Sequence, residues 1–382
     1  MKPTDLKIVA DENIPAIEML FSPFGEVIRR PGRHMSAADV QDADVLLVRS
    51  ITKVNQALLA DSKVNFVGTA TIGTDHIDQD YLRGAGIGFS SAPGCNADAV
   101  TEYVISTLYL LAQEQGFELQ DKVIGIIGVG NVGGRLQARL QRLGIKLLLN
   151  DPPRQQRDGG EFVTLDHLLR SADIICMHTP LVRQGDYPSF HLLNATNLPL
   201  LKTGAILLNA GRGPVIDNRA LLTWHLQRSD VTLVLDVWED EPVVDAGLAE
   251  RVRIGTPHIA GYSLDGKIRG TYMLYLAFCE RYALQPEFSL QQCLPAPEQP
   301  LIEMHQQDAA ISAIHAVYSP LEDDQRFRES LLDKAQQPIN FDLLRKHYPV
   351  RREFMAMQVA GVSRASRLGQ QLEALGFELL EH

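Results

Sequence analysis

Residues 122–133 read KVIGIIGVGNVG, and this stretch decides the fold. The apolar run Val123–Ile127 is typical of a buried strand, and the pattern of Val132–Leu143 is typical of a helix. Three glycines between them follow the spacing G-x-G-x-x-G. They permit a tight turn, the approach of a pyrophosphate to the backbone, and close packing of helix on strand. The stretch therefore predicts a dinucleotide-binding βαβ unit whose cofactor contacts are Gly128, Gly130, Asn131, Val132 and Gly133.

The strand expected after this helix ends in an acidic residue. Lys146–Asn150 is followed by Asp151, eighteen residues after Gly133. A carboxylate there can accept hydrogen bonds from the adenosine ribose hydroxyls and would repel a 2′-phosphate. Asp151 therefore favours NAD over NADP, although Arg154 and Arg157 lie just beyond it and weaken this preference.

Apolar runs of strand length recur on both sides of this unit and alternate with helical patterns. Most are apolar at successive positions, which indicates burial on both faces, as in a parallel sheet covered by helices. The other expected strands are Lys7–Ala10, Val45–Arg49, Asn65–Gly68, Asp173–Met177, Ala205–Asn209 and Thr232–Val237. The clearest helices are Asp98–Gln115, Leu264–Tyr282 and one that begins at the N-cap Asp217. This alternation predicts an α/β protein with two doubly wound, Rossmann-like domains.

Composition limits the partners and the compartment. The 382 residues include 36 Lys and Arg against 47 Asp and Glu, a formal net charge of −11, which disfavours nucleic acid as a partner. Cys95, Cys176, Cys279 and Cys293 lie far apart without a C-x-x-C pair, so we expect no metal site and a reducing compartment. No apolar run approaches the roughly 18 residues of a membrane span. We therefore expect a cytoplasmic protein without membrane contact.

Three polar groups follow later strands, where an open α/β sheet binds its ligands. They are Arg212 within LNAGRG, Glu241 within DVWEDEP and His258 within TPHIAGY. Oxidation of an alcohol by NAD removes a hydride from carbon and a proton from oxygen, and histidine can take that proton near neutral pH. We therefore predict His258 as the acid/base, Glu241 as the group that orients it, and Arg212 as the anchor of a substrate carboxylate.

These segments, downstream of the glycine motif, resemble the D-2-hydroxyacid dehydrogenase family. The resemblance covers roughly residues 1–285, and the family's Arg, Glu and His match this chain position by position. It implies a fold in which a NAD-binding domain is inserted into a split substrate-binding domain, and members of the family usually form dimers. We therefore expect residues 1–97 and 258–288 to form the substrate-binding domain and residues 98–257 the NAD-binding domain.

A proline-rich stretch, CLPAPEQP at residues 293–300, is expected to be a linker, because proline fixes φ and removes a donor. Beyond it lie strand patterns at Glu353–Val359 and Phe377–Leu380 and a helix pattern at Ser363–Leu375. We expect residues 289–382 to form a C-terminal αβ domain that makes a homodimer. Its basic run, LRKHYPVRR at residues 344–352, is expected to be a solvated face or an inter-subunit face.

Further segments resemble one subgroup of the family. They are DEN (11–13), VRSITK (48–53), TATIGTDH (69–76), APGCNA (92–97) and HIAGYSLDGK (258–267). Most family members instead carry Gly-Gly-Ser/Thr after the histidine. The resemblance implies oxidation of a phosphorylated 2-hydroxy acid, 4-phospho-D-erythronate, to 2-oxo-3-hydroxy-4-phosphobutanoate in pyridoxal 5′-phosphate biosynthesis. It also implies substrate contacts from Ser50, Thr71 and Tyr262, and contacts with NAD from Thr179, Ala210, Gly211, Arg212, Asp236 and Gly261 beside Asp151.

The phosphate of this substrate requires a second cationic subsite besides Arg212. The candidates are Arg49, Lys53, Lys267 and Arg269. Two alternative functions remain open: another dehydrogenase of the family, acting on 3-phosphoglycerate or a simple 2-hydroxy acid, or a protein that binds NAD as a sensor without turnover. The intact Arg, Glu and His argue against the sensor.

Overall fold

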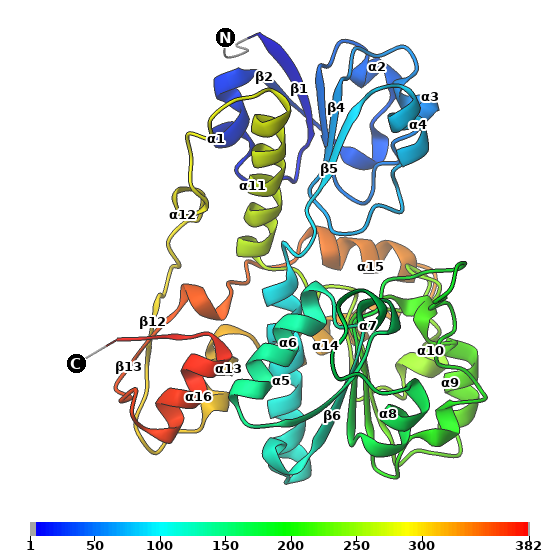
Figure 1. The fold of residues 1–382 in the computed structure, drawn as a ribbon, viewed down its shortest axis with the longest axis vertical. Helices are drawn as coiled ribbons and strands as arrows, with labels where there is room; N and C mark the ends of the chain where they lie inside the picture. Colours follow the sequence, from blue (N-terminus) through cyan, green and yellow to red (C-terminus); the bar gives the residue numbers. More distant parts are fainter. Residues whose placement is uncertain (1–4, 381–382) are drawn as a thin grey trace. The chain divides into compact units, whose positions relative to one another are not determined.

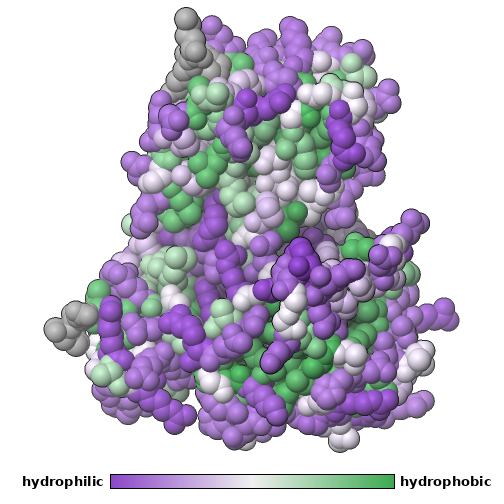
Figure 2. Space-filling view, viewed as in Figure 1, coloured by the Kyte–Doolittle hydropathy of each residue, from purple (hydrophilic) through white to green (hydrophobic). Residues whose placement is uncertain are grey.

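The computed structural model describes residues 5–380 (Figure 1). The chain divides into two compact units, each built from two separate segments. Unit 1 consists of residues 5–96 and Ser263–Ala296, and unit 2 of Ala97–Tyr262 and residues 297–380. On the face drawn in Figure 2, hydrophilic side chains cover most of each unit, as expected when apolar side chains form internal cores.

Unit 1 contains a five-stranded sheet in which every pair of neighbours is parallel, in the order β2-β1-β3-β4-β5. The strands are β1 (Leu6–Asp11), β2 (Gly25–Arg30), β3 (Val45–Val48), β4 (Phe66–Thr69) and β5 (Gly88–Ser91). The central strands β3 and β4 are buried along their whole length, whereas β2 and β5 at the edges are half-buried. Both faces of the sheet are therefore covered, as the continuous apolar runs predict.

Helices lie on the two faces of this sheet, and each face has its own core. One core joins α1 (Ile17–Phe21), α11 (Leu264–Arg281) and α12 (Leu290–Cys293) to β1 and β3. The other joins α2 (Ala37–Val40), α3 (Gln56–Leu59) and α4 (Gln79–Gly84) to the opposite face. In the first core the ring of Phe278 lies 4.8 Å from Phe24 and 5.5 Å from Phe21. The helix predicted at 264–282 therefore packs on the N-terminal sheet.

Unit 2 contains a six-stranded parallel sheet in the order β11-β10-β9-β8-β6-β7. Its strands are β6 (Val123–Ile127), β7 (Lys146–Asn150), β8 (Ile174–Met177), β9 (Ile206–Asn209), β10 (Thr232–Leu235) and β11 (Ile254–Gly255). Because β6 pairs with β7 on one side and β8 on the other, the chain reverses its direction of winding at β6. Such a switch point is where doubly wound sheets bind their ligands.

Two cores cover the faces of this sheet as well. Along β8, Ile174 and Cys176 join one core, and Ile175 and Met177 join the other. The first core includes α5 (Ala97–Gln115) and α6 (Asn131–Arg142), and the second includes α8 (Leu165–Ser171), α9 (Asn218–His225) and α10 (Ala246–Ala249). The short helix α7 (Pro152–Asp158) follows β7. The α/β class with two Rossmann-like sheets is confirmed.

The C-terminal segment adds helices and a small sheet to unit 2. Its helices are α13 (Ala310–Val317), α14 (Pro320–Ser330), α15 (Gln337–Lys346) and α16 (Arg367–Leu375). Its strands β12 (Leu301–Glu303), β13 (Gln358–Ala360) and β14 (Glu378–Leu379) are parallel. The strand predicted at Glu353–Val359 is wrong over its first half. Phe354–Ala356 is a 3₁₀ turn, closed by a hydrogen bond from Met357 N to Phe354 O at 3.0 Å.

None of the helices formed by residues 5–380 is both long enough and apolar enough to cross a membrane.

Candidate active site

The glycine-rich turn after β6 has the geometry that a dinucleotide requires. Gly128 has φ 84°, and a Cβ there would lie 2.9 Å from backbone atoms of His178 and Thr179. A Cβ on Gly133 would lie 2.0 Å from the Gly128 oxygen, so the helix can approach the strand only with glycine at this position. A Cβ on Gly130 would meet nothing within 4 Å, and no side chain caps the start of α6. Open space beside uncapped helix N–H groups fits a pyrophosphate.

Asp151 lies between the end of β7 and this turn. Its Oδ2 accepts a hydrogen bond from Val129 N at 2.7 Å, and its Oδ1 accepts one from Arg154 N at 2.9 Å. A carboxylate offers about four lone-pair sites, so capacity for ribose hydroxyls remains. Arg154 also donates to the Val129 oxygen, which places a cation beside the same turn.

The loop after β9, which carries Arg212, passes next to Thr179 at Gly211. Asn209 is buried and braces the loop: its side chain accepts from Gly211 N at 3.0 Å and donates to the Arg212 oxygen at 3.1 Å. A Cβ on Gly211 would lie 3.0 Å from the Thr179 oxygen. Ala210 N donates to the oxygen of Met177, at the end of β8. The predicted cofactor residues of β8 and β9 are thus adjacent.

Asp236, at the end of β10, holds the turn that carries His258. Its carboxylate is buried and accepts hydrogen bonds from the Thr256 hydroxyl (2.7 Å), Ile259 N (2.8 Å) and Ala260 N (3.1 Å). Burial raises the pKa of Asp236, although these hydrogen bonds and the charge of the nearby His258 act to lower it. Both carboxylate oxygens of Asp236 accept hydrogen bonds from the turn, so this side chain positions the turn. Its contact with NAD stays a prediction.

His258 and Glu241 form a direct pair. Nδ1 of His258 lies 2.7 Å from Oε2 of Glu241, and Oε1 of the same carboxylate accepts from Trp238 N at 2.8 Å. Burial alone would raise the pKa of Glu241, but the charge and hydrogen bond of His258 hold it below its ordinary value. His258 has φ 58°, a left-handed conformation that costs free energy in a non-glycine residue and that occurs preferentially at functional sites.

Tyr262 closes this turn beside the C-terminal segment. Its backbone N–H donates to the Ile259 oxygen at 2.8 Å, one residue after Gly261. Its ring meets the ring of Tyr348 edge-on, with centroids 5.6 Å apart, and the guanidinium carbon of Arg345 lies 5.7 Å from its centroid.

Ser50 and Thr71, the other predicted substrate residues, belong to unit 1. They follow the neighbouring strands β3 and β4, so they lie at the same edge of that sheet. The Thr71 hydroxyl is 2.7 Å from the Thr69 hydroxyl and donates to the Gly73 oxygen at 3.0 Å. Ser50 is exposed.

The four phosphate candidates also lie in unit 1, and three of them already have electrostatic or hydrogen-bond neighbours. Arg49 Nε pairs with Asp11 Oδ1 at 3.0 Å, and Arg269 donates to the Cys95 oxygen. Burial and the charge of Arg49 lower the pKa of Lys267 to about 8. Lys53 is exposed.

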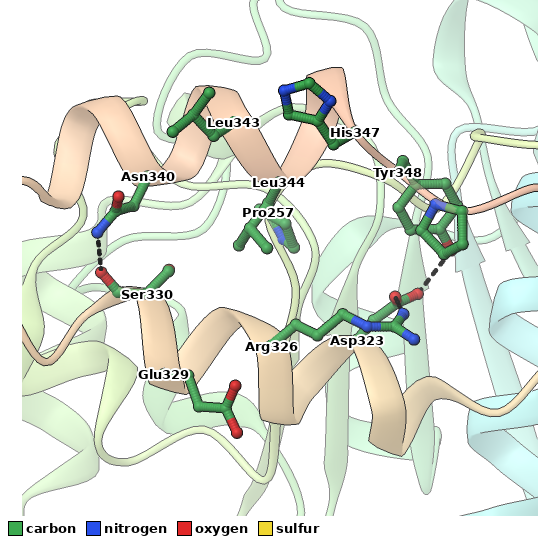
Figure 3. Close-up of a pocket in the computed structure, with 11 residues that line it drawn as sticks. Pro257, Asp323, Arg326, Glu329, Ser330, Asn340, Leu343, Leu344, His347 and Tyr348 are labelled. Atoms are coloured by element: carbon green, nitrogen blue, oxygen red, sulfur yellow. Dashed lines mark hydrogen bonds and ion pairs between the residues drawn. The ribbon is translucent and has the colours of Figure 1, made fainter.

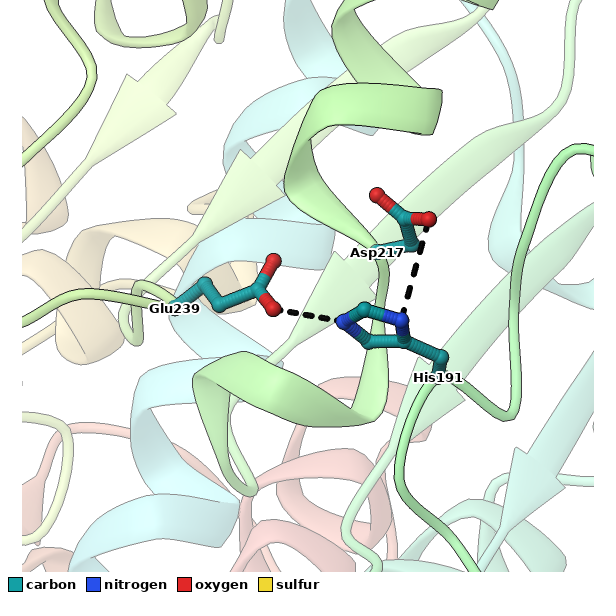
Figure 4. Close-up of side chains that lie close together, drawn as sticks. All are labelled: His191, Asp217 and Glu239. Carbon is teal, nitrogen blue, oxygen red and sulfur yellow. Dashed lines mark hydrogen bonds and ion pairs between the residues drawn. The ribbon is translucent and has the colours of Figure 1, made fainter.

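His191, which belongs to no predicted motif, connects its own loop to two other loops (Figure 4). His191 Nε2 lies 2.5 Å from Glu239 Oε1, and its Nδ1 lies 3.7 Å from Asp217 Oδ2. The other oxygens of both carboxylates accept backbone N–H groups at the start of α9. The cluster therefore joins the loop after β8 to the loops after β9 and β10. His191 lies in an irregular loop without a motif, so no sequence signal identifies it.

The C-terminal segment supports the loops that carry Glu241 and His258, and no sequence pattern indicates this packing. Phe327 of α14 stacks on Trp238 with centroids 5.2 Å apart, and Phe341 of α15 meets Phe327 at 6.3 Å. Gln337 donates to the oxygen of Val244, three residues beyond Glu241, at 2.8 Å.

Part of the basic run at 344–352 is buried, so the expectation of a solvated or inter-subunit face is wrong for Arg351. This side chain is only 4% exposed. It donates to the Ala260 oxygen at 3.1 Å and to the Ala99 oxygen at 2.6 Å, and it lies 3.8 Å from the Tyr318 ring centroid. It therefore binds the backbone next to the His258 turn.

A pocket of about 540 Å³ lies between α14 and α15 (Figure 3). Its walls include Pro257, directly before His258, with Leu343, Leu344 and His347 from α15 and its following turn. Tyr348 donates to Asp323 at 2.7 Å across one end.

Comparisons with known proteins agree with this architecture. Residues 104–260 match the family described as "D-isomer specific 2-hydroxyacid dehydrogenase, NAD binding domain", and residues 293–376 match "Domain of unknown function (DUF3410)". Among solved structures, NAD⁺-bound 3-phosphoglycerate dehydrogenase of Entamoeba histolytica shares the fold with a TM-score of 0.63 and 22% identity, over 73% of this chain and 96% of that one. D-lactate dehydrogenase of Aquifex aeolicus also shares the fold, with a TM-score of 0.57 and 22% identity, over 72% of this chain and 96% of that one.

Closer relatives align along the full length. The erythronate-4-phosphate dehydrogenase of Pseudomonas entomophila is 52% identical over 379 residues, which are 98% of this chain and 99% of the relative. The erythronate-4-phosphate dehydrogenase of Azotobacter vinelandii is 49% identical over 378 residues, which are 98% of this chain and 100% of the relative. The chain therefore belongs to the erythronate-4-phosphate dehydrogenases, within the D-2-hydroxyacid dehydrogenase family.

Proposed function

We propose that this protein oxidises 4-phospho-D-erythronate to 2-oxo-3-hydroxy-4-phosphobutanoate, a step of pyridoxal 5′-phosphate biosynthesis, with NAD as the cofactor. The observation that carries the proposal is identity of 52% over nearly the whole chain to an erythronate-4-phosphate dehydrogenase. The paired His258 and Glu241, 2.7 Å apart at the carboxyl ends of the strands in unit 2, supply a matching acid/base.

The roles follow from the chemistry of each group. The residues of the glycine turn and Asp151 would hold NAD, which would supply the acceptor for the hydride of the substrate's C2 atom. Glu241 accepts a hydrogen bond from Nδ1 of His258, which leaves Nε2 free to take the proton of the C2 hydroxyl. Arg212 has a guanidinium suited to bidentate binding of the C1 carboxylate. The proton then passes from His258 to water, so each turnover yields the 2-oxo acid, NADH and one proton.

The remaining assignments rest on the sequence and on local geometry. Gly128–Gly133 and Asp151 would hold the pyrophosphate and the adenosine ribose, and the loops carrying Thr179, Arg212 and Gly261 would contact the rest of the cofactor. Ser50, Thr71 and Tyr262 offer hydroxyl groups, which suit a polyhydroxylated substrate because they donate and accept without adding charge.

Purified protein, NAD and 4-phospho-D-erythronate test the proposal by the increase in nicotinamide absorbance, with 3-phosphoglycerate and unphosphorylated D-erythronate as comparison substrates. We expect the highest kcat/KM with 4-phospho-D-erythronate. A higher value with 3-phosphoglycerate would support another dehydrogenase of the family. Binding of NAD without turnover of any of these acids would support the sensor.

We also infer that the C-terminal segment pairs two copies of the chain. Ile339 and Leu343 lie one turn apart on one face of α15 and are 55% and 43% exposed, and Leu332 and Val350 are 84% and 76% exposed. Replacement of Ile339 and Leu343 by Glu should shift the mass in solution from dimer to monomer. A double variant that stays fully dimeric would contradict this inference.

A further inference from the structure

Arg345 lies near the end of α15, where its guanidinium carbon is 5.7 Å from the ring centroid of Tyr262. It is one helical turn beyond Phe341, which is fully buried, so both side chains share one face of the helix. Asn340, Leu343 and Leu344 line the pocket between α14 and α15 instead. Because Phe341 and Gln337 fix α15 against the loop that carries Glu241, the direction of Arg345 is also fixed.

The guanidinium of Arg345 lies among groups of the proposed active site. Its central carbon is 5.7 Å from the centroid of Tyr262, and its Nε is buried without a hydrogen-bond partner among residues 5–380. Burial works against the charge of Arg345, but the charges of Tyr262, Glu241 and Asp342 and a side-chain hydrogen bond with Tyr262 raise its pKa. The interaction is mutual, since the charge of Arg345 helps to lower the pKa of Glu241.

The partners of Arg345 do not use its whole donor capacity. A guanidinium has five N–H donors, and a buried charge is costly unless it is paired. The nearby carboxylate of Glu241 is already hydrogen-bonded to His258 and to Trp238 N, at 2.7 and 2.8 Å. An anionic ligand beside Tyr262 would complete the hydrogen bonding of Arg345, and Arg345 would screen that anion from Glu241.

The proposed substrate brings such an anion. Its carboxylate is assigned to Arg212, and its phosphate, with a charge near −2, needs another cation. We propose that Arg345, with the hydroxyl of Tyr262, binds the phosphate group of the substrate. This inference rests on the proposed function and deepens it. The match to the NAD-binding domain ends at residue 260, whereas Arg345 lies in the separately matched segment 293–376. Phosphate recognition is thus an addition by the C-terminal segment.

The test compares two substrates that differ only in the phosphate. We expect Arg345→Met to lower the ratio of kcat/KM for 4-phospho-D-erythronate over D-erythronate by roughly 30- to 1,000-fold, the usual scale for losing one partner of a buried charge pair. Arg345→Lys should restore part of the ratio. Lys346→Met removes an exposed charge at the next position of the same helix and is the matched control, with an expected ratio near that of the unaltered protein.

Two results would overturn the proposal. A parallel fall for both substrates in Arg345→Met would show that Arg345 only supports Glu241 and Tyr262. An unaltered ratio, combined with a collapse of the ratio in Lys267→Met, would assign the phosphate to Lys267, the other half-buried cation. Thermal unfolding shows whether each variant is folded. If Arg345→Met does not fold, the ratio of kcat/KM values is compared between Arg345→Lys and the unaltered protein.

A binding experiment separates this inference from the proposed function. Inorganic phosphate, titrated into NAD-loaded protein and followed by calorimetry, should bind the unaltered protein and Lys346→Met, and its affinity for Arg345→Met should fall at least tenfold. Equal affinity in all three would refute the subsite. Absence of turnover with 4-phospho-D-erythronate would refute the proposed function, while loss of phosphate binding in Arg345→Met alone would still support the subsite.

Discussion

Replacement of Glu241 by Gln tests the catalytic pair with almost no change in shape. In the native protein, Oε1 of Glu241 accepts from Trp238 N at 2.8 Å and Oε2 faces Nδ1 of His258 at 2.7 Å. The Trp238 N–H requires an acceptor, so the amide oxygen of Gln must remain at the first position. The amide NH₂ must then face Nδ1 and donate to it. Nδ1 becomes the acceptor, the proton moves to Nε2, and the imidazole can no longer take a proton from the substrate.

The expected loss follows from this wrong tautomer. Removing the orienting carboxylate of a catalytic histidine costs about 10³- to 10⁴-fold in kcat, or about 4–5.5 kcal/mol of transition-state stabilisation. Steady-state kinetics with 4-phospho-D-erythronate measure it, and NAD binding and thermal unfolding show whether the site is otherwise intact. Glu239→Gln is the matched control, because this carboxylate of the same loop pairs with His191. A Glu241→Gln enzyme that keeps kcat within about threefold would refute the reasoning.

Four other substitutions probe separate features. His258→Ala should lower kcat by roughly 10²- to 10⁴-fold, with NAD binding retained in a fluorescence titration; unchanged turnover would remove its acid/base role. Arg212→Lys should raise KM at least tenfold by losing bidentate carboxylate binding, and a KM equal to the native value would count against it. Asp151→Ala should lower the NAD/NADP ratio of kcat/KM, and an unaltered ratio would contradict the ribose assignment. The pKa of Lys267 is lowered from 10.5 to about 8. Its partly buried charge therefore lowers the free energy of unfolding by the full amount below pH 8, and this destabilisation disappears as the pH rises toward 10.5. Lys267→Met should therefore raise the free energy of unfolding by up to about 3 kcal/mol at pH 7 and by little at pH 10.5, and denaturant titrations that show the same difference at both pH values would be inconsistent with this.

Strands with consecutive apolar residues could be predicted from the sequence, and the two edge strands of unit 1 could not. Val123–Ile127 has its predicted bounds, because a continuous apolar run in a parallel sheet has few other interpretations. The edge strand Lys146–Asn150 also has its predicted bounds, although it is mostly half-buried, because three consecutive leucines mark it. The missed strands Gly25–Arg30 and Gly88–Ser91 lie at the two edges of the unit 1 sheet and are half-buried. Their polar and small residues give no periodic apolar signal, so only the pairing with β1 and β4 reveals them.

The candidate site shows the same division. The glycine turn and the His258–Glu241 pair could be predicted because strand ends and tight turns leave fixed spacings in the sequence. Arg345 could not, because it lies in a polar helix whose position against the Glu241 loop depends on contacts such as Gln337 with Val244. From sequence alone, a basic residue on a short helix is predicted to be exposed to solvent, and only the packing of that helix shows otherwise.

The contacts of the C-terminal segment tie it to the backbone beside the loop that carries His258. Asp324 accepts from Gly255 N at 2.7 Å, Arg328 donates to the Val252 oxygen at 2.8 Å, and Arg351 donates to the Ala260 oxygen at 3.1 Å. Buried backbone groups require partners, and each one left unpaired costs about 1–3 kcal/mol. Three such groups together cost about 3–9 kcal/mol, a large part of the 5–15 kcal/mol by which domains are typically stable. A chain that ends before α14 would therefore lose the support of its His258 turn, so the dimer is better tested by surface charges than by truncation.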